Sequence, residues 1–227
     1  AMGNVTLLRR ATVWAYREHD YLLVTERAPD RTGLLERTWR VRAGHVITAT
    51  GAIERGLVFG NNDRPGVMLA SAVQSYVNRY GVAPGRRAVI FANNTSAYTV
   101  AADLAAAGIE VAAIIDSRSD VPAEARAAVP GLPIRAGYVV TTAHGGRSLR
   151  GVTVAPRDGG EAERLDCDLL AVSGGWNPAV HLFSQSRGTL RYDDSLASFL
   201  PGDAAQSTCA AGAAAGAMEL EAALASG

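Results

Sequence analysis

Residues 88–118 constrain the fold of this chain more than any other stretch. They read AVIFANNTSAYTVAADLAAAGIEVAAIIDSR: an apolar run, a polar turn, an alanine-rich segment and a second apolar run that ends on Asp116. This order is typical of the strand–turn–helix–strand unit that opens a dinucleotide-binding domain, in which an acid after the second strand holds a ribose hydroxyl. The stretch therefore predicts an α/β fold of the Rossmann type.

The turn of this unit lacks the glycines that a dinucleotide needs. In place of G-x-G-x-x-G/A the chain has Ala92, Asn94 and Ala97 at the three glycine positions. Ala97 can serve the third role, close packing of helix on strand, but the Asn94 side chain stands where phosphate oxygens would lie. Two interpretations follow. Either Asp116 still serves a weakened nucleotide site, or Asp116 caps the strand end and Arg118 is solvated; the missing glycines favour the second.

Composition excludes several kinds of partner. The 227 residues are 48% hydrophobic and 19% charged, with a formal net charge of zero, so neither a nucleic acid nor an acidic membrane surface is expected to bind. No apolar run has the length of a membrane-spanning helix. With no visible signal peptide, we expect a cytoplasmic protein.

The reactive residue types also narrow the chemistry. The chain has no lysine, which excludes a lysine nucleophile, and its two cysteines, Cys167 and Cys209, form no C-x-x-C pair. The four histidines have no metal-ligand spacing, and no Ser-His-Asp order is present. We therefore predict no metal site and no catalytic residue within the chain.

Strand and helix patterns indicate one domain interrupted by another. The predicted outer domain comprises residues 1–84 and 157–227, and the inserted second Rossmann-like domain comprises residues 85–156 with its degenerate glycine loop. In the outer domain we expect a β-meander, a loop at 27–33, a strand that ends at Thr50 and an alanine-rich helix over 207–224. No strand–turn–helix start precedes the meander, so we expect a segment of a longer polypeptide whose outer domain lacks its first βαβ unit.

Several stretches resemble the alpha subunit of heterotetrameric sarcosine oxidase, within the flavoproteins that carry two dinucleotide domains of the disulfide reductase type. The resemblance runs from about Val41 to the end and rests on the order of its motifs. The matching stretches are ATGAIE at 49–54, NDRPGVM at 62–68, the turn at 91–98, GGWNP at 174–178 and HLFSQ at 181–185.

The resemblance implies a role within a larger flavoenzyme. That family oxidatively demethylates an N-methyl amino acid at a flavin on its beta subunit, and the alpha subunit carries an NAD site in its outer domain. It implies NAD as the cofactor of the full subunit, with FAD as the alternative, and the beta and other subunits as partners. Thr50, Gly51, Gly202 and Asp203 match the positions that would contact the cofactor, and the isolated chain is expected to be inactive and to bind none tightly.

Two other functions stay open at this point. The chain could belong to a self-sufficient NAD(P)-linked flavin reductase of the disulfide reductase type, although the absent C-x-x-C and absent glycine loop count against it. It could also be a non-enzymatic module that holds partner subunits after its nucleotide site decayed.

Overall fold

The structure, a computed structural model, describes residues 3–27, 33 and 35–227. It divides into two compact units: an outer unit formed by Ala1–Ile53 with Asn177–Gly227, and an inner unit formed by Glu54–Trp176. Each unit is described by itself. Among the described residues no helix is both long and apolar enough to span a bilayer.

The inner unit is built on a five-stranded sheet in which every neighbouring pair is parallel. Its strands are uniformly apolar in the centre, as expected of a parallel sheet that is covered on both faces. In spatial order they are β6 (Val67–Leu69), β13 (Leu169–Ser173), β7 (Arg87–Ala92), β8 (Glu110–Asp116) and β9 (Ile134–Ala136).

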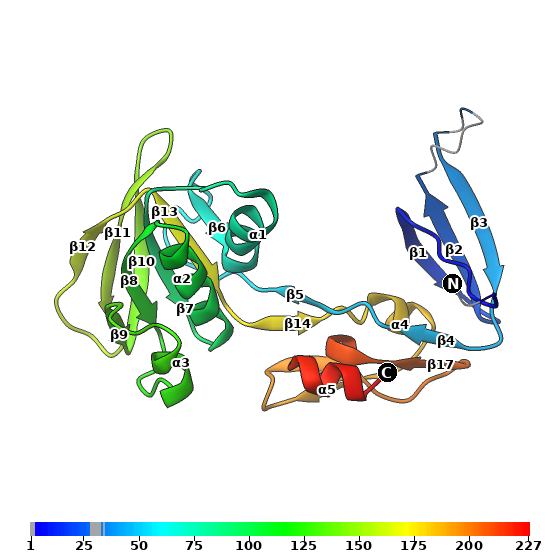
Figure 1. Cartoon of the computed structure of the whole chain (residues 1–227). Helices are drawn as coiled ribbons and strands as arrows, with labels where there is room; N and C mark the ends of the chain where they lie inside the picture. Colours follow the sequence, from blue (N-terminus) through cyan, green and yellow to red (C-terminus); the bar gives the residue numbers. More distant parts are fainter. Residues whose placement is uncertain (1–2, 28–32, 34) are drawn as a thin grey trace. The chain divides into compact units, whose positions relative to one another are not determined.

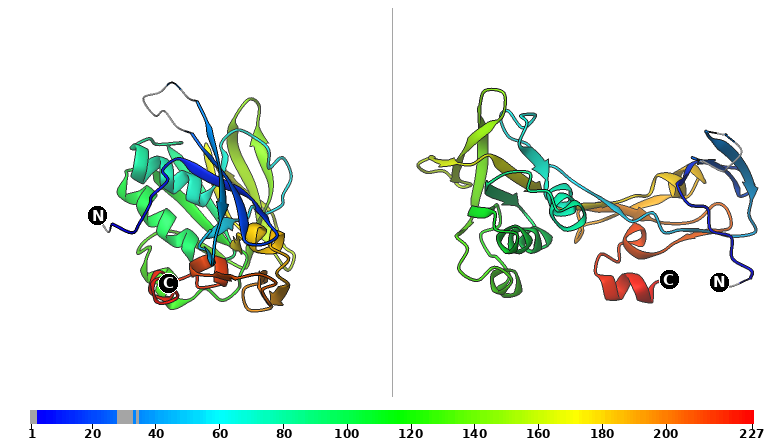
Figure 2. Two further views of the ribbon diagram at one scale, coloured as in Figure 1. Left: turned by 90° about the vertical axis from the view of Figure 1, so that its right-hand side faces the viewer. Right: turned by 45° about the horizontal axis from the view of Figure 1, so that its top comes forward.

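Helices cover one face of this sheet and an antiparallel meander covers the other (Figures 1 and 2). The helices are α1 (Ala70–Tyr80), α2 (Ser96–Ala106) and α3 (Ala123–Ala127); the meander is β10 (Tyr138–Gly145), β11 (Leu149–Pro156) and β12 (Glu163–Asp166). This three-layer arrangement confirms the α/β fold predicted from residues 88–118.

The inner unit, Glu54–Trp176, contains more of the chain than the inserted domain predicted at 85–156. The cause is β13, which begins after a bend at Asp168 and enters the sheet of the inner unit. The Asp168 carboxylate accepts hydrogen bonds from the backbone N–H of Arg86 and Arg87 at 2.8–3.1 Å. Because β13 lies between β6 and β7, residues on both sides of 85–156 belong to the same sheet.

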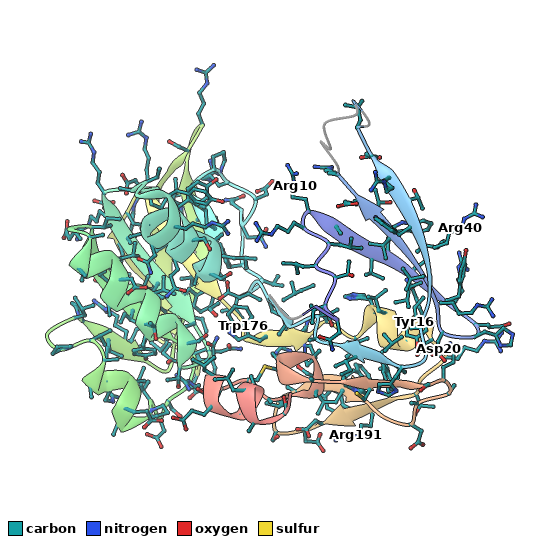
Figure 3. All side chains as sticks on the ribbon, turned by 45° about the vertical axis from the view of Figure 1, so that its right-hand side comes forward. Arg10, Tyr16, Asp20, Arg40, Trp176 and Arg191 are labelled. Carbon is teal, nitrogen blue, oxygen red and sulfur yellow. The ribbon has the colours of Figure 1, made fainter. Side chains whose placement is uncertain are left out.

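The outer unit contains the predicted meander, made of β1 (Ala11–Arg17), β2 (Tyr21–Glu26) and β3 (Arg37–Arg42). The expected loop at 27–33 lies mostly outside the described residues. Tyr16 and Leu22 pack with Val46 in a small core. The Tyr16 hydroxyl donates to Asp20 Oδ1 at 2.5 Å in the turn that follows β1 (Figure 3).

The rest of the outer unit combines short strands and short helices. Strand β4 (Val46–Thr48) pairs in parallel with β17 (Thr208–Ala210), and β15 (Leu190–Asp193) forms an antiparallel hairpin with β16 (Ser198–Pro201). The helix α4 (His181–Gln185) precedes the hairpin.

The prediction of one helix over residues 207–224 is wrong. That segment forms β17, a 3₁₀ turn at Gly212–Ala215 and the short helix α5 (Leu220–Ala225). Two glycines explain the break, since Gly212 and Gly216 have φ values of +64° and +93°, which a continuous right-handed helix cannot contain.

The chain enters the inner unit through β5 (Ala52–Glu54) and leaves it through β14 (Trp176–Pro178), and these two strands pair with each other. Glu54 is buried, and its Oε2 accepts the N–H of Ser71 at 2.8 Å in the first turn of α1. The carboxylate thus satisfies a donor that the helix itself leaves free. The outgoing segment approaches the incoming one closely, because a Cβ on Gly174 would lie 2.7 Å from the carbonyl oxygen of Gly56.

Candidate functional site: two strand edges

The first candidate edge lies where β7 and β13 end in the inner unit. The turn after β7 is filled by Asn94, whose Nδ2 donates to the carbonyl oxygen of Ser173 at 3.1 Å and to Ser173 Oγ at 3.0 Å. Ser96 Oγ donates to Asn94 Oδ1 at 2.6 Å. Neither Asn93 nor Asn94 adopts a positive φ. The amide therefore ties two neighbouring strand ends together, and it does so with the groups that would otherwise be free for a ligand.

Asp116, at the end of β8, is fully buried and already bound. Its Oδ2 accepts from the Tyr98 hydroxyl at 2.8 Å and from Arg118 Nη2 at 2.7 Å, while Arg118 Nε lies 3.1 Å from Oδ1. Arg118 Nη1 also donates to Thr95 Oγ1 at 3.3 Å. Arg118 is thus held by the site, which corrects the expectation that it is solvated.

In this network the pKa values of Tyr98 and Arg118 are both raised, so that both side chains keep the protons they donate. Burial, followed by the hydrogen bond to Asp116, raises the pKa of Tyr98 above its ordinary value. The hydrogen bonds from Arg118 to Asp116 raise the pKa of the guanidinium. The backbone N–H of Arg118 also donates to Asp116 Oδ1 at 2.9 Å. With the phenol and two guanidinium donors, this fills the acceptor sites of the carboxylate and leaves none for a ribose hydroxyl, so these residues do not fit a dinucleotide.

The second candidate edge lies in the outer unit, where Thr50 and Gly51 follow β4. Thr50 Oγ1 donates to the carbonyl oxygen of Ala179 at 2.7 Å, and Ala179 N–H donates to the carbonyl oxygen of Gly51 at 2.9 Å. Gly51 has a φ of +74°, and a Cβ there would meet no atom within 4 Å. The backbone at Gly51 is therefore open to a ligand group.

Gly202 and Asp203 lie between two strands and not at the start of a helix. They follow β16, a strand of the antiparallel hairpin, and both are exposed. Gly202 N–H donates to the carbonyl oxygen of Thr189 at 2.8 Å, and Asp203 N–H donates to Thr189 Oγ1 at 2.9 Å. The helix expected over residues 207–224 does not begin there, because residues 208–210 form strand β17. A cofactor contact by Gly202 or Asp203 stays a prediction.

The structure brings a different pair to the Thr50–Gly51 edge. Since β17 runs parallel to β4, the carboxyl ends of both strands meet at one edge of the sheet. Ala211 N–H donates to the carbonyl oxygen of Thr48 at 3.1 Å, and Gly212 follows with a φ of +64°. Sequence reasoning missed Ala211 and Gly212 because the surrounding alanines indicated a helix. The signal for a strand that ends here was the β-branched Thr208 followed, after three residues, by Gly212.

This outer edge leaves more room beside the backbone than the inner edge does. Gly51 is open, and a Cβ on Gly212 would meet only Ala223 Cβ, at 3.8 Å. Two glycines with positive φ at adjacent strand ends allow a bulky group to approach the backbone. Among the described residues no group of three or more metal-ligating side chains gathers. The N–H of Gly212 donates to Ser226 Oγ at 2.7 Å, so this edge offers room beside the backbone rather than a free donor at Gly212.

Sequence comparison identifies relatives along the whole chain, although no family model matches it. The sarcosine oxidase alpha subunit of Corynebacterium sp. (strain U-96) is 42% identical over 100% of this chain and 25% of its own length. That of Rhizobium meliloti (strain 1021) is 40% identical over 95% of this chain and 22% of its own length. The chain thus spans about a quarter of the length of these curated relatives.

Solved structures share the fold at low identity. The thioredoxin reductase of T. acidophilum superposes with a TM-score of 0.67 at 16% identity, covering 95% of this chain and 68% of that one. A FAD-dependent pyridine nucleotide-disulphide oxidoreductase from Desulfovibrio vulgaris gives a TM-score of 0.56 at 16% identity, covering 82% and 47%. The resemblance inferred from the motifs at 49–54, 62–68 and 174–178 is confirmed, and the fold is shared with these two oxidoreductases.

Proposed function

We propose, from the 40–42% identity of this chain to part of the sarcosine oxidase alpha subunits, that it serves as the dinucleotide-domain region of an amine-oxidising flavoenzyme. The reaction is the oxidative demethylation of an N-methyl amino acid, carried out together with a beta and further subunits. The relatives' names, each a subunit of a sarcosine oxidase, support both the substrate class and the partners. Within the chain no residue is assigned to catalysis.

In this proposal the two units have different tasks. The inner unit is a scaffold that keeps its fold without a nucleotide, and the observation that carries this is the pairing of Asp116 with Arg118 and Tyr98. The outer unit supports a dinucleotide, NAD or FAD, at the edge formed by Thr50, Gly51 and Gly212. When bound, that cofactor supplies hydride or electron transfer; the residues of this chain bind and orient it.

Titration calorimetry with NAD and with FAD tests the division of tasks. We expect at most weak binding by the chain alone, and the same weak binding after Ala92 and Asn94 are both changed to glycine, because Arg118 still occupies Asp116. Micromolar NAD binding by this double variant, absent from the wild type, would show that the two side chains were the only obstacle and would overturn the scaffold role of the inner unit.

A second experiment tests the outer edge inside the complete enzyme. Gly51→Val imposes a side chain on a backbone with a φ of +74°, while Gly44→Ala changes a glycine of the same unit without a positive φ and with no atom within 4 Å of its Cβ. In the assembled oxidase we expect Gly51→Val to weaken cofactor retention, measured as bound NAD and FAD per complex, and Gly44→Ala to retain it. Full retention by Gly51→Val would remove Gly51 from the cofactor site.

A further inference from the structure

The two cysteines of the chain have opposite environments. Cys167 is buried in the inner unit, where burial and the neighbouring carboxylates of Asp168 and Asp166 raise its pKa to about 12. Since the thiolate is the reactive form, Cys167 is an inert thiol at neutral pH. Cys209, in strand β17 of the outer unit, is exposed.

Cys209 lies next to a histidine that is itself held by a third side chain. Its Sγ is 3.5 Å from His45 Nε2, and His45 Nδ1 is 2.9 Å from Ser207 Oγ. All three residues belong to the outer unit. A nucleophile beside a base that a further group orients is the arrangement found in activated thiols and hydroxyls.

The parallel pairing of β4 and β17 fixes this arrangement. His45 and Ser207 directly precede the paired residues Val46 and Thr208, and Val46 N–H donates to the carbonyl oxygen of Ser207 at 2.9 Å. Side chains two residues apart share a face of a strand, so Cys209 lies on the face of Ser207. Cys209 is registered opposite Ile47, which is 62% exposed, so this face is open to solvent.

We propose that Cys209, His45 and Ser207 form a thiol-exchange site for small disulfides. Nε2 of His45 faces the sulfur and accepts the thiol proton, while Nδ1–H donates to Ser207 Oγ and fixes the ring in that tautomer. The Cys209 sulfur attacks one sulfur of R–S–S–R. A Cys209–S–S–R bond forms, the original S–S bond breaks, and the leaving thiolate takes the proton from His45. One thiol and one disulfide thus give one mixed disulfide and one thiol, with no other oxidant.

An aromatic disulfide with a coloured leaving thiolate, 5,5′-dithiobis(2-nitrobenzoate), tests the site in the full chain. We expect one thiol to react in the native protein and the second only after denaturation, with mass spectrometry placing the native adduct on Cys209. Cys209→Ser should abolish the native reaction. Native labelling of Cys167 instead, or of no thiol at all, would overturn the proposal.

The histidine is tested by the rate of the same reaction. His45→Gln removes the base while keeping a polar side chain, and we expect the native rate to fall at least about threefold at neutral pH. His181→Gln is the matched control, because His181 is also exposed in the outer unit. Circular dichroism spectra should be unchanged for both variants. A wild-type rate for His45→Gln would show that the imidazole does not assist, and the site would be rejected.

Discussion

Asp116 shows at the scale of one residue how a position that binds ribose in dinucleotide-binding units serves a structural role instead. The acid still ends β8, where a ribose hydroxyl would be bound, but the guanidinium of Arg118 and the phenol of Tyr98 now occupy its oxygens. A buried charge with two such partners is costly to disrupt, because removing one member leaves the others without a partner away from water.

We therefore expect Asp116→Ala to lower the free energy of unfolding of the inner unit by about 3–5 kcal/mol, as for other broken buried pairs. Urea unfolding measures this change. Asp158→Ala is the control: the Asp158 side chain is 88% exposed and its partner Arg157 lies 3.5 Å away, so its effect should stay within about 0.5 kcal/mol. A loss below about 1 kcal/mol for Asp116→Ala would show that the network adds little stability.

Gly174 makes a second residue-scale prediction. A methyl group there would lie 2.7 Å from the Gly56 carbonyl oxygen and 3.1 Å from that of Arg55, so the paired segments would have to separate. Gly174→Ala should destabilise the inner unit by about 1–3 kcal/mol, the usual effect of overpacking. Gly56→Ala serves as the control, because its Cβ would meet nothing within 4 Å. Equal stability of the two variants in urea would contradict the close-approach argument.

At the scale of elements, the meander of the outer unit depends on one buried tyrosine in β1. Burial, then the hydrogen bond to Asp20, raises the pKa of Tyr16 to about 12. The folded chain therefore keeps the phenol proton to a higher pH than the unfolded chain, where tyrosine titrates near 10. The stabilising contribution is complete below pH 10 and is lost as the pH rises from about 10 to 12.

Tyr16→Phe should remove this alkaline loss from the outer unit, a difference of up to about 2 kcal/mol between pH 9 and pH 12. Thermal melting followed by circular dichroism at both pH values measures it. Tyr192→Phe, which changes an exposed tyrosine of β15, should melt like the wild type. If Tyr16→Phe loses as much stability as the wild type above pH 10, the phenol is not the group responsible.

The elements that sequence predicted correctly are those with uniform local patterns. The apolar runs of β7 and β8 carry their signal within a few residues. The alanine-rich segment after Ser207 was wrongly predicted as a helix because alanine favours a helix locally. The pairing of β17 with β4, which is distant in sequence, overrides that local preference.

The contacts that sequence could not predict are those that depend on side-chain direction. Arg64, in the turn before β6, donates Nη1 to the carbonyl oxygens of Gly145 and Gly146, about eighty residues away. Arg118 was assigned to solvent because nothing local indicates that its guanidinium folds back onto Asp116. The candidate outer edge was only half predicted, since Thr50 and Gly51 follow a strand whose neighbour, β17, was expected to be a helix.

At the scale of the whole molecule, the chain forms two compact units joined by β5 and β14. Units with separate hydrophobic cores are expected to unfold in separate transitions. We expect differential scanning calorimetry to resolve two transitions. Asp116→Ala should lower only the transition of the inner unit, whereas alkaline pH should affect the outer unit of the wild type more than that of Tyr16→Phe. A single transition that shifts as a whole in every variant would show one cooperative molecule.

The arginine that closes the inner edge also has a consequence for design. Building a nucleotide site there requires glycines at 92 and 94 and the withdrawal of Arg118 from Asp116. Withdrawal alone leaves a buried carboxylate unpaired at a cost of about 3–5 kcal/mol, a large part of the stability of a typical domain. Because the withdrawal of Arg118 weakens the fold before any ligand can compensate, the ion pair opposes nucleotide binding at this edge through the stability of the unit itself.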